Sequence, residues 1–232
     1  MPPRPSTIGM LVYPRMDQID FTGPFEVLSR LPDAALHVIG LARQPVRDMA
    51  GLVLTPEAAL HDAPPLDVLH VPGGPGQQAL MDHEPLLSLI RRQMESGRHV
   101  FSVCTGALLC GAAGILKGRR ATTHWAAFDL LPYFGAIPVD ARVVVDGTLV
   151  TAAGVTAGID GALVLAALLR GDEIAQQIQL AMEYAPEPRF HSGSPRTAPP
   201  EVREAVTAGY RQLTEARAAT ARQVAVRLGI AI

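Results

Sequence analysis

Two compact apolar runs, each followed at once by turn residues or by a helix, restrict the fold more than any other feature of the chain. Residues 66–71 end at a Pro-Gly-Gly turn, and residues 99–103 pass through Cys104 into a small-residue helix predicted over 106–116. Runs of this length with such boundaries are typical of buried strands. Strands that alternate with helices predict an α/β protein with a mostly parallel sheet covered on both faces.

The rest of the chain continues this alternation. Further strands are predicted at 7–12 and 36–41, a small hairpin at 46–55, and a stronger hairpin at 143–150 around Asp146-Gly147. Helices are predicted from Gly23-Pro24 onward and at 85–96, 126–134, 157–169, 172–184 and 201–228, with Asp172 as the cap of its helix.

The chain is long enough for one large domain with an extension. An extended, proline-containing connector at 185–200 places the only plausible boundary near residue 190. We expect a catalytic domain over 1–190. The extension at 191–232 is too short for a core of its own, so it should pack on the body or on a partner subunit.

Composition excludes several classes of function. The net charge of −2 gives no bulk attraction to nucleic acid or to an anionic membrane. The longest strongly apolar stretch, 161–169, is far shorter than the roughly 20 residues that span a bilayer. No signal-peptide core precedes the first predicted strand, so a cytoplasmic location is expected.

The chain also has few residues that could act as nucleophiles or metal ligands. Two cysteines, Cys104 and Cys110, cannot build a disulfide framework or a four-thiolate zinc site, and the histidines form no metal-ligand array. Lys117 is the single lysine, so Schiff-base chemistry would depend on it alone. The phosphate-binding and dinucleotide-binding glycine motifs are absent.

Cys104 lies where a predicted strand turns sharply into a helix, the layout of a nucleophile elbow. A thiol at a helix N-terminus should have a lowered pKa, because the helix dipole and free N–H groups stabilise the thiolate. The alternative is a buried core cysteine, which is the commonest fate of a free thiol. Cys110, inside the helix, is expected to be core.

Two other segments should meet Cys104 at the carboxyl edge of the sheet. The loop Pro72-Gly73-Gly74 could hold a developing negative charge with its N–H groups, although it could equally be a plain turn. Asp20 follows the first strand and could act as a general acid or base, with Asp17 as a competitor of the same type. A carboxylate beside a thiolate is unfavourable, so one of the two should hold a proton.

Three further residues and segments remain open from the residues alone. Glu26 could face either the site or solvent. His124 could be the base partner of Cys104 or a structural histidine, and the second reading is preferred. The segment Gly154-Val155-Thr156 could line a pocket or simply join a strand to a helix.

Taken together, these motifs resemble the DJ-1/PfpI superfamily, and within it the isocyanide hydratases. The resemblance covers about residues 7–200. The matching segments, in order, are Asp20-Phe-Thr-Gly-Pro24, Val71-Pro-Gly-Gly74, Ser102-Val-Cys-Thr-Gly106, Ala121-Thr-Thr-His-Trp125, Gly154-Val-Thr-Ala-Gly-Ile-Asp160 and the late segment 183–198.

The resemblance implies a flavodoxin-like three-layer α/β sandwich, a homodimer, and no metal or organic cofactor. It implies a lyase in which Cys104 attacks the terminal carbon of an isocyanide to form a thioimidate, while Asp20 moves protons. Thr105 would lie beside the nucleophile. Gly73, Gly74, Val155 and Thr156 match binding positions, and the Val155 N–H would face the sulfur.

The chain also departs from other branches of the superfamily. Protease-like members carry histidine directly after the cysteine, where this chain has Thr105, and deglycase-like members use a glutamate where Asp20 stands. The alternative function is a ligand-sensing or redox-sensing protein. One form is the sensor domain of AraC-type regulators, and the other is a glyoxalase-like or stress-response protein in which Cys104 is oxidised.

Overall fold

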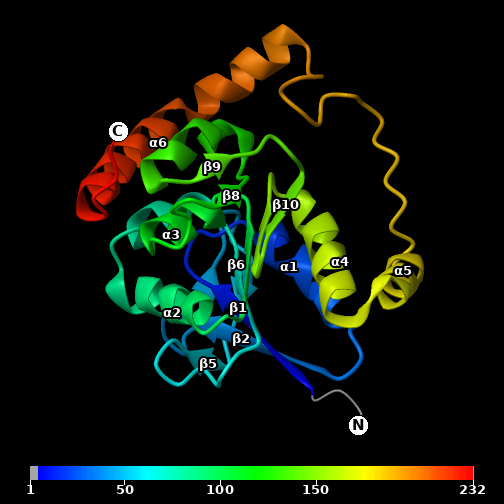
Figure 1. Ribbon diagram of the computed structural model, residues 1–232. Helices are drawn as coiled ribbons and strands as arrows, with labels where there is room; N and C mark the ends of the chain where they lie inside the picture. Colours follow the sequence, from blue (N-terminus) through cyan, green and yellow to red (C-terminus); the bar gives the residue numbers. More distant parts are fainter. Residues whose placement is uncertain (1–4, 232) are drawn as a thin grey trace.

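The computed structural model describes residues 5–231, which form a central seven-stranded sheet flanked by helices (Figure 1). The strand order is β10-β11-β7-β6-β1-β2-β5, and only the β10–β11 pair is antiparallel. The strands are β10 (Val143–Asp146), β11 (Leu149–Ala152), β7 (His99–Val103), β6 (Val68–Val71), β1 (Ser6–Val12), β2 (Ala34–Gly40) and β5 (Ala58–Ala59).

Helices cover both faces of the sheet and make it a three-layer sandwich. One face carries α1 and α4, with α5 packed on the outer side of α4, and the other face carries α2 and α3 (Figure 1). The helices are α1 (Gln18–Leu28), α2 (Glu84–Glu95), α3 (Gly106–Ala112), α4 (Ala157–Arg170), α5 (Asp172–Ala181) and α6 (Pro200–Arg227), with 3₁₀ helices η1 (Pro75–Leu80) and η2 (Trp125–Phe134).

The predicted flavodoxin-like α/β fold is therefore confirmed, and its centre explains the apolar runs of the sequence. Every residue of β6 is buried, as are the last four of β7, because helices cover both sides of these strands. The two predicted hairpins are also present. One is the β10–β11 pair, and the other joins β3 (Val46–Arg47) to β4 (Val53–Leu54). A short parallel pair, β8 (Arg120–Ala121) with β9 (Ile137–Pro138), lies outside the main sheet.

Several element boundaries predicted from sequence are wrong, and three of them bear on the helix ends described next. Helix α1 begins at Gln18 rather than at Gly23-Pro24, because Asp17 caps it by accepting a hydrogen bond from the Ile19 N–H at 3.1 Å, and Pro24 lies inside the helix. Helix α3 ends at Ala112, earlier than expected, and Gly114 follows with a positive φ. Asp172 is the first residue of α5, and Gly171 occupies the cap position.

Helix α6 crosses the end of the body after an extended connector (Figure 1). Its residues up to Gln212 are exposed, although the ring of Tyr210 contacts Trp125 of η2. The helix packs against η1 and η2. Four of its residues are buried there: Arg217, Ala221, Val224 and Ala225. The division at residue 190 stays a prediction, but the end of α6 is in contact with the body.

A buried histidine occupies the middle of the sheet. His70, on β6, is fully buried between the rings of Phe21 and Phe101, and neither ring nitrogen has a well-aligned hydrogen-bond partner among the described residues. Burial lowers the pKa of His70 to about 3, although an interaction with the Asp20 carbonyl opposes the shift. The folded protein therefore holds this ring neutral well below the usual histidine pKa of about 6.5.

This neutral ring predicts a loss of stability in mild acid. Below about pH 6.5 the imidazole of His70 binds a proton in the unfolded chain but stays neutral in the folded chain. The free energy of unfolding therefore falls as the pH drops from about 6.5 toward 3. At pH 5 the loss due to His70 should be about 2 kcal/mol. Urea unfolding at pH 7.5 and pH 5 should show a smaller pH effect in His70→Leu than in the unmodified protein. An equal pH effect in both proteins would refute this assignment.

Candidate active site

Cys104 sits on a strained turn between β7 and α3. Its φ is +55°, a left-handed conformation that non-glycine residues seldom adopt. The turn is held on both sides, because the Cys104 N–H donates to the Ala152 carbonyl at 3.0 Å and the Thr123 hydroxyl donates to the Cys104 carbonyl at 2.7 Å. A Cβ at Gly106 would lie 2.1 Å from the Val71 carbonyl oxygen, so only glycine fits the first helical position. The predicted nucleophile elbow is confirmed.

Asp20 lies beside this elbow and is completely buried. The Gly73 N–H donates to its Oδ2 at 2.8 Å, and the Cys104 thiol interacts with the same carboxyl group. The second oxygen, Oδ1, accepts no hydrogen bond from the described nitrogen and oxygen donors. The carboxyl is therefore held by one backbone donor and faces the sulfur with capacity to bind or release a proton.

A buried tyrosine, Tyr13, holds the glycine loop that follows β6. The Tyr13 hydroxyl lies 2.6 Å from the Pro72 carbonyl and 3.0 Å from the Gly73 carbonyl, and the Gly73 carbonyl also accepts the Asp17 N–H at 3.1 Å. Gly74 has φ +113°, and a Cβ there would lie 2.3 Å from the Asp17 nitrogen. This loop therefore requires glycine, and it directs the Gly73 N–H at Asp20.

Thr105 links the elbow to the same loop. Its Oγ1 accepts the Gly74 N–H at 3.1 Å and a guanidinium N–H of Arg217 at 3.3 Å. Thr105 is buried and is the N-cap residue of α3. Its hydroxyl thus helps to hold the loop that carries the Asp20 hydrogen bond.

The electrostatics of the pair differ from the sequence expectation. Burial, followed by the negative charge of Asp20, raises the pKa of the Cys104 thiol well above its usual range, while the Thr105 N–H and Arg217 lower it. Burial, followed by Asp17, raises the pKa of Asp20, while the Gly73 N–H and the thiol lower it. The predicted low pKa of Cys104 is wrong for this buried state, because loss of solvent outweighs the helix terminus. The pair favours a shared proton over two negative charges.

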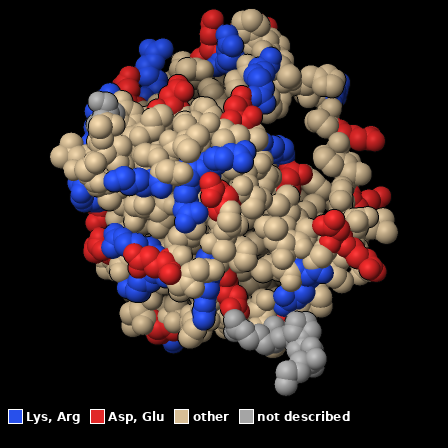
Figure 2. Space-filling view, viewed as in Figure 1, with Lys and Arg blue, Asp and Glu red and all other residues tan. Residues whose placement is uncertain are grey.

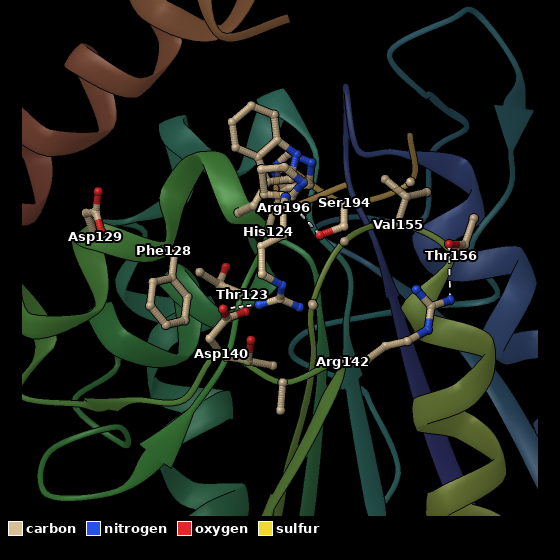
Figure 3. A pocket seen from close by; sticks show the side chains of 17 residues that line it. Thr123, His124, Phe128, Asp129, Asp140, Arg142, Val155, Thr156, Ser194 and Arg196 are labelled. Atoms are coloured by element: carbon tan, nitrogen blue, oxygen red, sulfur yellow. Dashed lines mark hydrogen bonds and ion pairs between the residues drawn. The ribbon is translucent and has the colours of Figure 1, made fainter. Parts of the chain in front are cut away.

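A cavity of about 510 Å³ lies close to the elbow, although Cys104 is not among the residues that line it. Figure 3 shows the side chains that line this cavity. Thr123, which holds the Cys104 carbonyl, lines it, and so do Val155 and Thr156 from the segment before α4. Its wall combines aromatic groups with a polar rim. The other lining residues include His124, Trp125, Phe128, Asp129, Asp140, Arg142 and the connector residues 193–196.

The rim of this cavity is tied together by ion pairs. Arg142 Nε lies 2.6 Å from an Asp160 oxygen, and the same guanidinium donates to the Thr156 hydroxyl at 3.3 Å (Figure 3). Arg196, on the connector, pairs with Asp140, and both residues line the cavity (Figure 3). The connector thus forms part of the cavity wall. Elsewhere on the face shown in Figure 2, basic and acidic side chains are interspersed.

The remaining candidates lie in less direct positions. His124 accepts the Ala126 N–H through Nδ1 at 3.2 Å, and burial, with a smaller effect of Arg217, lowers its pKa to about 4. It is therefore a neutral capping residue in the wall of the cavity. Glu26 is exposed and pairs with Arg30, away from the thiol. Cys110 is fully buried, and burial raises its pKa to about 12.

Sequence reasoning missed two residues of the site, Tyr13 and Arg217. Tyr13 follows the first predicted strand, and its position at the carboxyl edge of the sheet could have identified it. Arg217 has no such indication, because it lies in a long helical pattern of balanced charge.

Residues 5–231 hold neither a cluster of metal-ligating side chains nor a helix that could span a membrane. No group of three or more histidine, cysteine, aspartate or glutamate side chains gathers there as a metal site would require. In the same part of the chain, every helix is too short or too polar to cross a membrane.

Comparisons with known proteins agree with this geometry. A family model, DJ-1/PfpI family, matches residues 6–168. The isonitrile hydratase of Pseudomonas putida is 54% identical over 195 residues, which are 84% of this chain and 86% of that protein. The HTH-type transcriptional regulator GbdR of Pseudomonas aeruginosa is 28% identical over 182 residues, which are 75% of this chain but 49% of the regulator.

A solved structure extends the similarity almost to the full chain. The crystal structure of a THiJ/PfpI family protein from Pseudomonas syringae matches with a TM-score of 0.90 and 41% identity, covering 94% of this chain and 90% of that one. The cysteine elbow, the glycine loop and the sheet order all occur within the region that the family model matches. The chain therefore belongs to the DJ-1/PfpI family.

Proposed function

We propose that this protein hydrates isonitriles to N-substituted formamides, with Cys104 as the nucleophile. The observation that carries the proposal is the buried pair of Cys104 and Asp20, in which a soft sulfur and a proton-holding carboxyl group face each other. The 54% identity to the isonitrile hydratase of Pseudomonas putida supports the choice of substrate class.

The chemistry needs one nucleophile and one proton carrier. The sulfur attacks the terminal carbon of R–N≡C, and the proton held between the thiol and Asp20 passes to that carbon, giving the thioimidate R–N=CH–S–Cys. Water then adds to this carbon, with Asp20 accepting its proton and returning one to nitrogen. The C–S bond breaks, the sulfur regains a proton, and R–NH–CHO leaves. In the net reaction, one isonitrile and one water molecule give one N-substituted formamide.

Each neighbour of the pair has a role in this scheme. The Gly73 N–H keeps Asp20 aimed at the sulfur, and the φ of +55° presents the Cys104 side chain at a fixed angle. The Val155 N–H would face the sulfur, as the family resemblance implies. Thr105 would act indirectly, through the loop that holds Asp20.

The cavity beside the elbow is proposed as the site of the R group. Its volume of about 510 Å³ falls in the range of small-ligand pockets, roughly 300–1,000 Å³. Trp125, Phe128 and Val155 offer apolar wall for an aryl or alkyl group, while water could enter along the polar rim. We also propose a homodimer and a cytoplasmic location, which light scattering and cell fractionation would test.

The first experiment is a time course of p-nitrophenyl isocyanide with the purified protein, following N-(4-nitrophenyl)formamide by chromatography. Steady formation of many formamide molecules per protein would establish the reaction class. Absence of turnover in a folded protein would reject the proposal. Methylglyoxal would then test the glyoxalase-like alternative, and a search for a bound ligand would test the sensing role.

A further inference from the structure

Helix α6 places a buried guanidinium inside the cysteine site. Arg217 is 3% exposed although it belongs to the C-terminal extension. Its Nε donates to Gln77 Oε1 at 3.0 Å, and one terminal nitrogen donates to the Gly74 carbonyl at 3.1 Å and to Thr105 Oγ1 at 3.3 Å. These contacts join α6 to the glycine loop and to the residue after the nucleophile.

Within the described part of the chain, the charge of Arg217 has no acidic partner. Among residues 5–231, no carboxylate forms an ion pair with this guanidinium, and its three acceptors are neutral. A buried cation without a counterion is costly, and it favours any anion that forms nearby. Arginine stays charged in proteins, so a full positive charge faces the elbow.

The titratable and charged groups around Cys104 come from four parts of the chain. Asp20 on α1 and Asp17 before it bear negative charge and oppose the thiolate. Tyr13, after β1, is held neutral, because burial raises its pKa well above the usual range. His124, from the segment before η2, is neutral at physiological pH. Arg217 is thus the one cation among the described groups that act on this thiol.

We propose that Arg217 is a positioning residue that stabilises the thiolate form of Cys104 during catalysis. It offsets the negative charge that appears on the sulfur, and its fork holds the Gly74 carbonyl and the Thr105 hydroxyl in place. The inference rests on the proposed role of Cys104 as nucleophile. It also gives the C-terminal extension a function: α6 completes the active site.

The test separates the charge from the hydrogen bonds. The rate constant for alkylation of Cys104 by iodoacetamide would be measured at fixed pH values from 7 to 9.5 by peptide mass spectrometry, in the intact protein. Arg217→Met removes charge and donors, Arg217→Gln keeps a donor without charge, and Arg217→Lys keeps the charge without the fork. Arg227→Met is the matched control, since Arg227 on the same helix donates to the Met81 and Ala112 carbonyls instead.

The neutral variants should lower the alkylation rate constant at each pH tenfold or more, because a smaller fraction of the thiol is ionised. Arg217→Lys should keep the alkylation rate close to the original but lower kcat on p-nitrophenyl isocyanide at least fivefold, because Thr105 and Gly74 lose the two-pronged guanidinium donor. Arg227→Met should leave both readouts unchanged. Circular dichroism identifies the folded variants, and if one neutral variant is unfolded the other carries the comparison.

Two results would overturn the inference. One is an unchanged alkylation rate in a folded neutral variant. The other is an equal loss of rate in Arg227→Met, which would mean that docking of α6, rather than the charge of Arg217, controls the thiol. Because alkylation needs no isonitrile, slower alkylation of the neutral variants together with no turnover in the unmodified protein would refute the proposed reaction and leave the effect of Arg217 on the thiol standing.

Discussion

Cys104→Ala should abolish isonitrile turnover while the protein remains folded. Loss of a covalent nucleophile removes the thioimidate route altogether, so formamide production should fall by at least about 10⁴-fold. The elbow itself should survive, because its hydrogen bonds use the backbone N–H and carbonyl of residue 104 and not the sulfur. Product formation from p-nitrophenyl isocyanide, measured beside circular dichroism, checks both parts of the prediction.

Cys110→Ala is the matched control for this experiment. Cys110 is the second thiol of the same helix region, fully buried and with a pKa raised to about 12, so it should not react. Its removal should cost some stability and leave kcat intact. Cys104→Ser should be almost as inactive as alanine, because a hydroxyl is a much weaker nucleophile than a thiolate. Full activity in Cys104→Ala would exclude this residue as the nucleophile.

The fold was predictable where local pattern and burial coincide. Strands β6 and β7 are mostly apolar; Pro72 follows β6, and β7 passes through Cys104 directly into α3, so the positions of both strands follow from the sequence. The predicted start of α1 is wrong because Pro24 suggested the first turn of a helix. The N-cap is instead Asp17, which lies six residues before Gly23. Capping by a side chain can outweigh the usual placement of proline.

The site was predictable only where chain topology brings residues together. Asp20, Gly73 and Cys104 each follow a parallel strand, and the carboxyl ends of such strands share one edge of the sheet. Arg217 follows no strand. It reaches the site because α6 returns across the body after the connector, and this path depends on tertiary packing that no local pattern encodes.

The protonation of the pair was also beyond sequence reasoning. A thiol at the start of a helix is expected to ionise easily, and the Thr105 N–H does act in that direction. Complete burial acts against it and is the largest effect on both Cys104 and Asp20. The degree of burial is set by packing from α1, the glycine loop and α6 together, so the balance emerges only in the folded protein.

Asp20→Asn should move turnover and thiol reactivity in opposite directions. Asparagine can still accept the Gly73 N–H, but it cannot hold and return a proton, so kcat should fall by about 10²–10⁴-fold. The Asp20 charge raises the pKa of Cys104, so its removal should lower that pKa and speed alkylation of the sulfur by iodoacetamide near neutral pH.

Asp17→Asn is the matched control, because Asp17 also raises the pKa of Cys104 but is only half-buried and caps α1. It should speed alkylation less than Asp20→Asn and keep most of the turnover. If Asp20→Asn lost turnover and thiol reactivity together, its effect would be structural. Because a merely structural carboxyl cannot make the sulfur more reactive and the enzyme less active at once, the opposed changes identify Asp20 as the group that carries the proton.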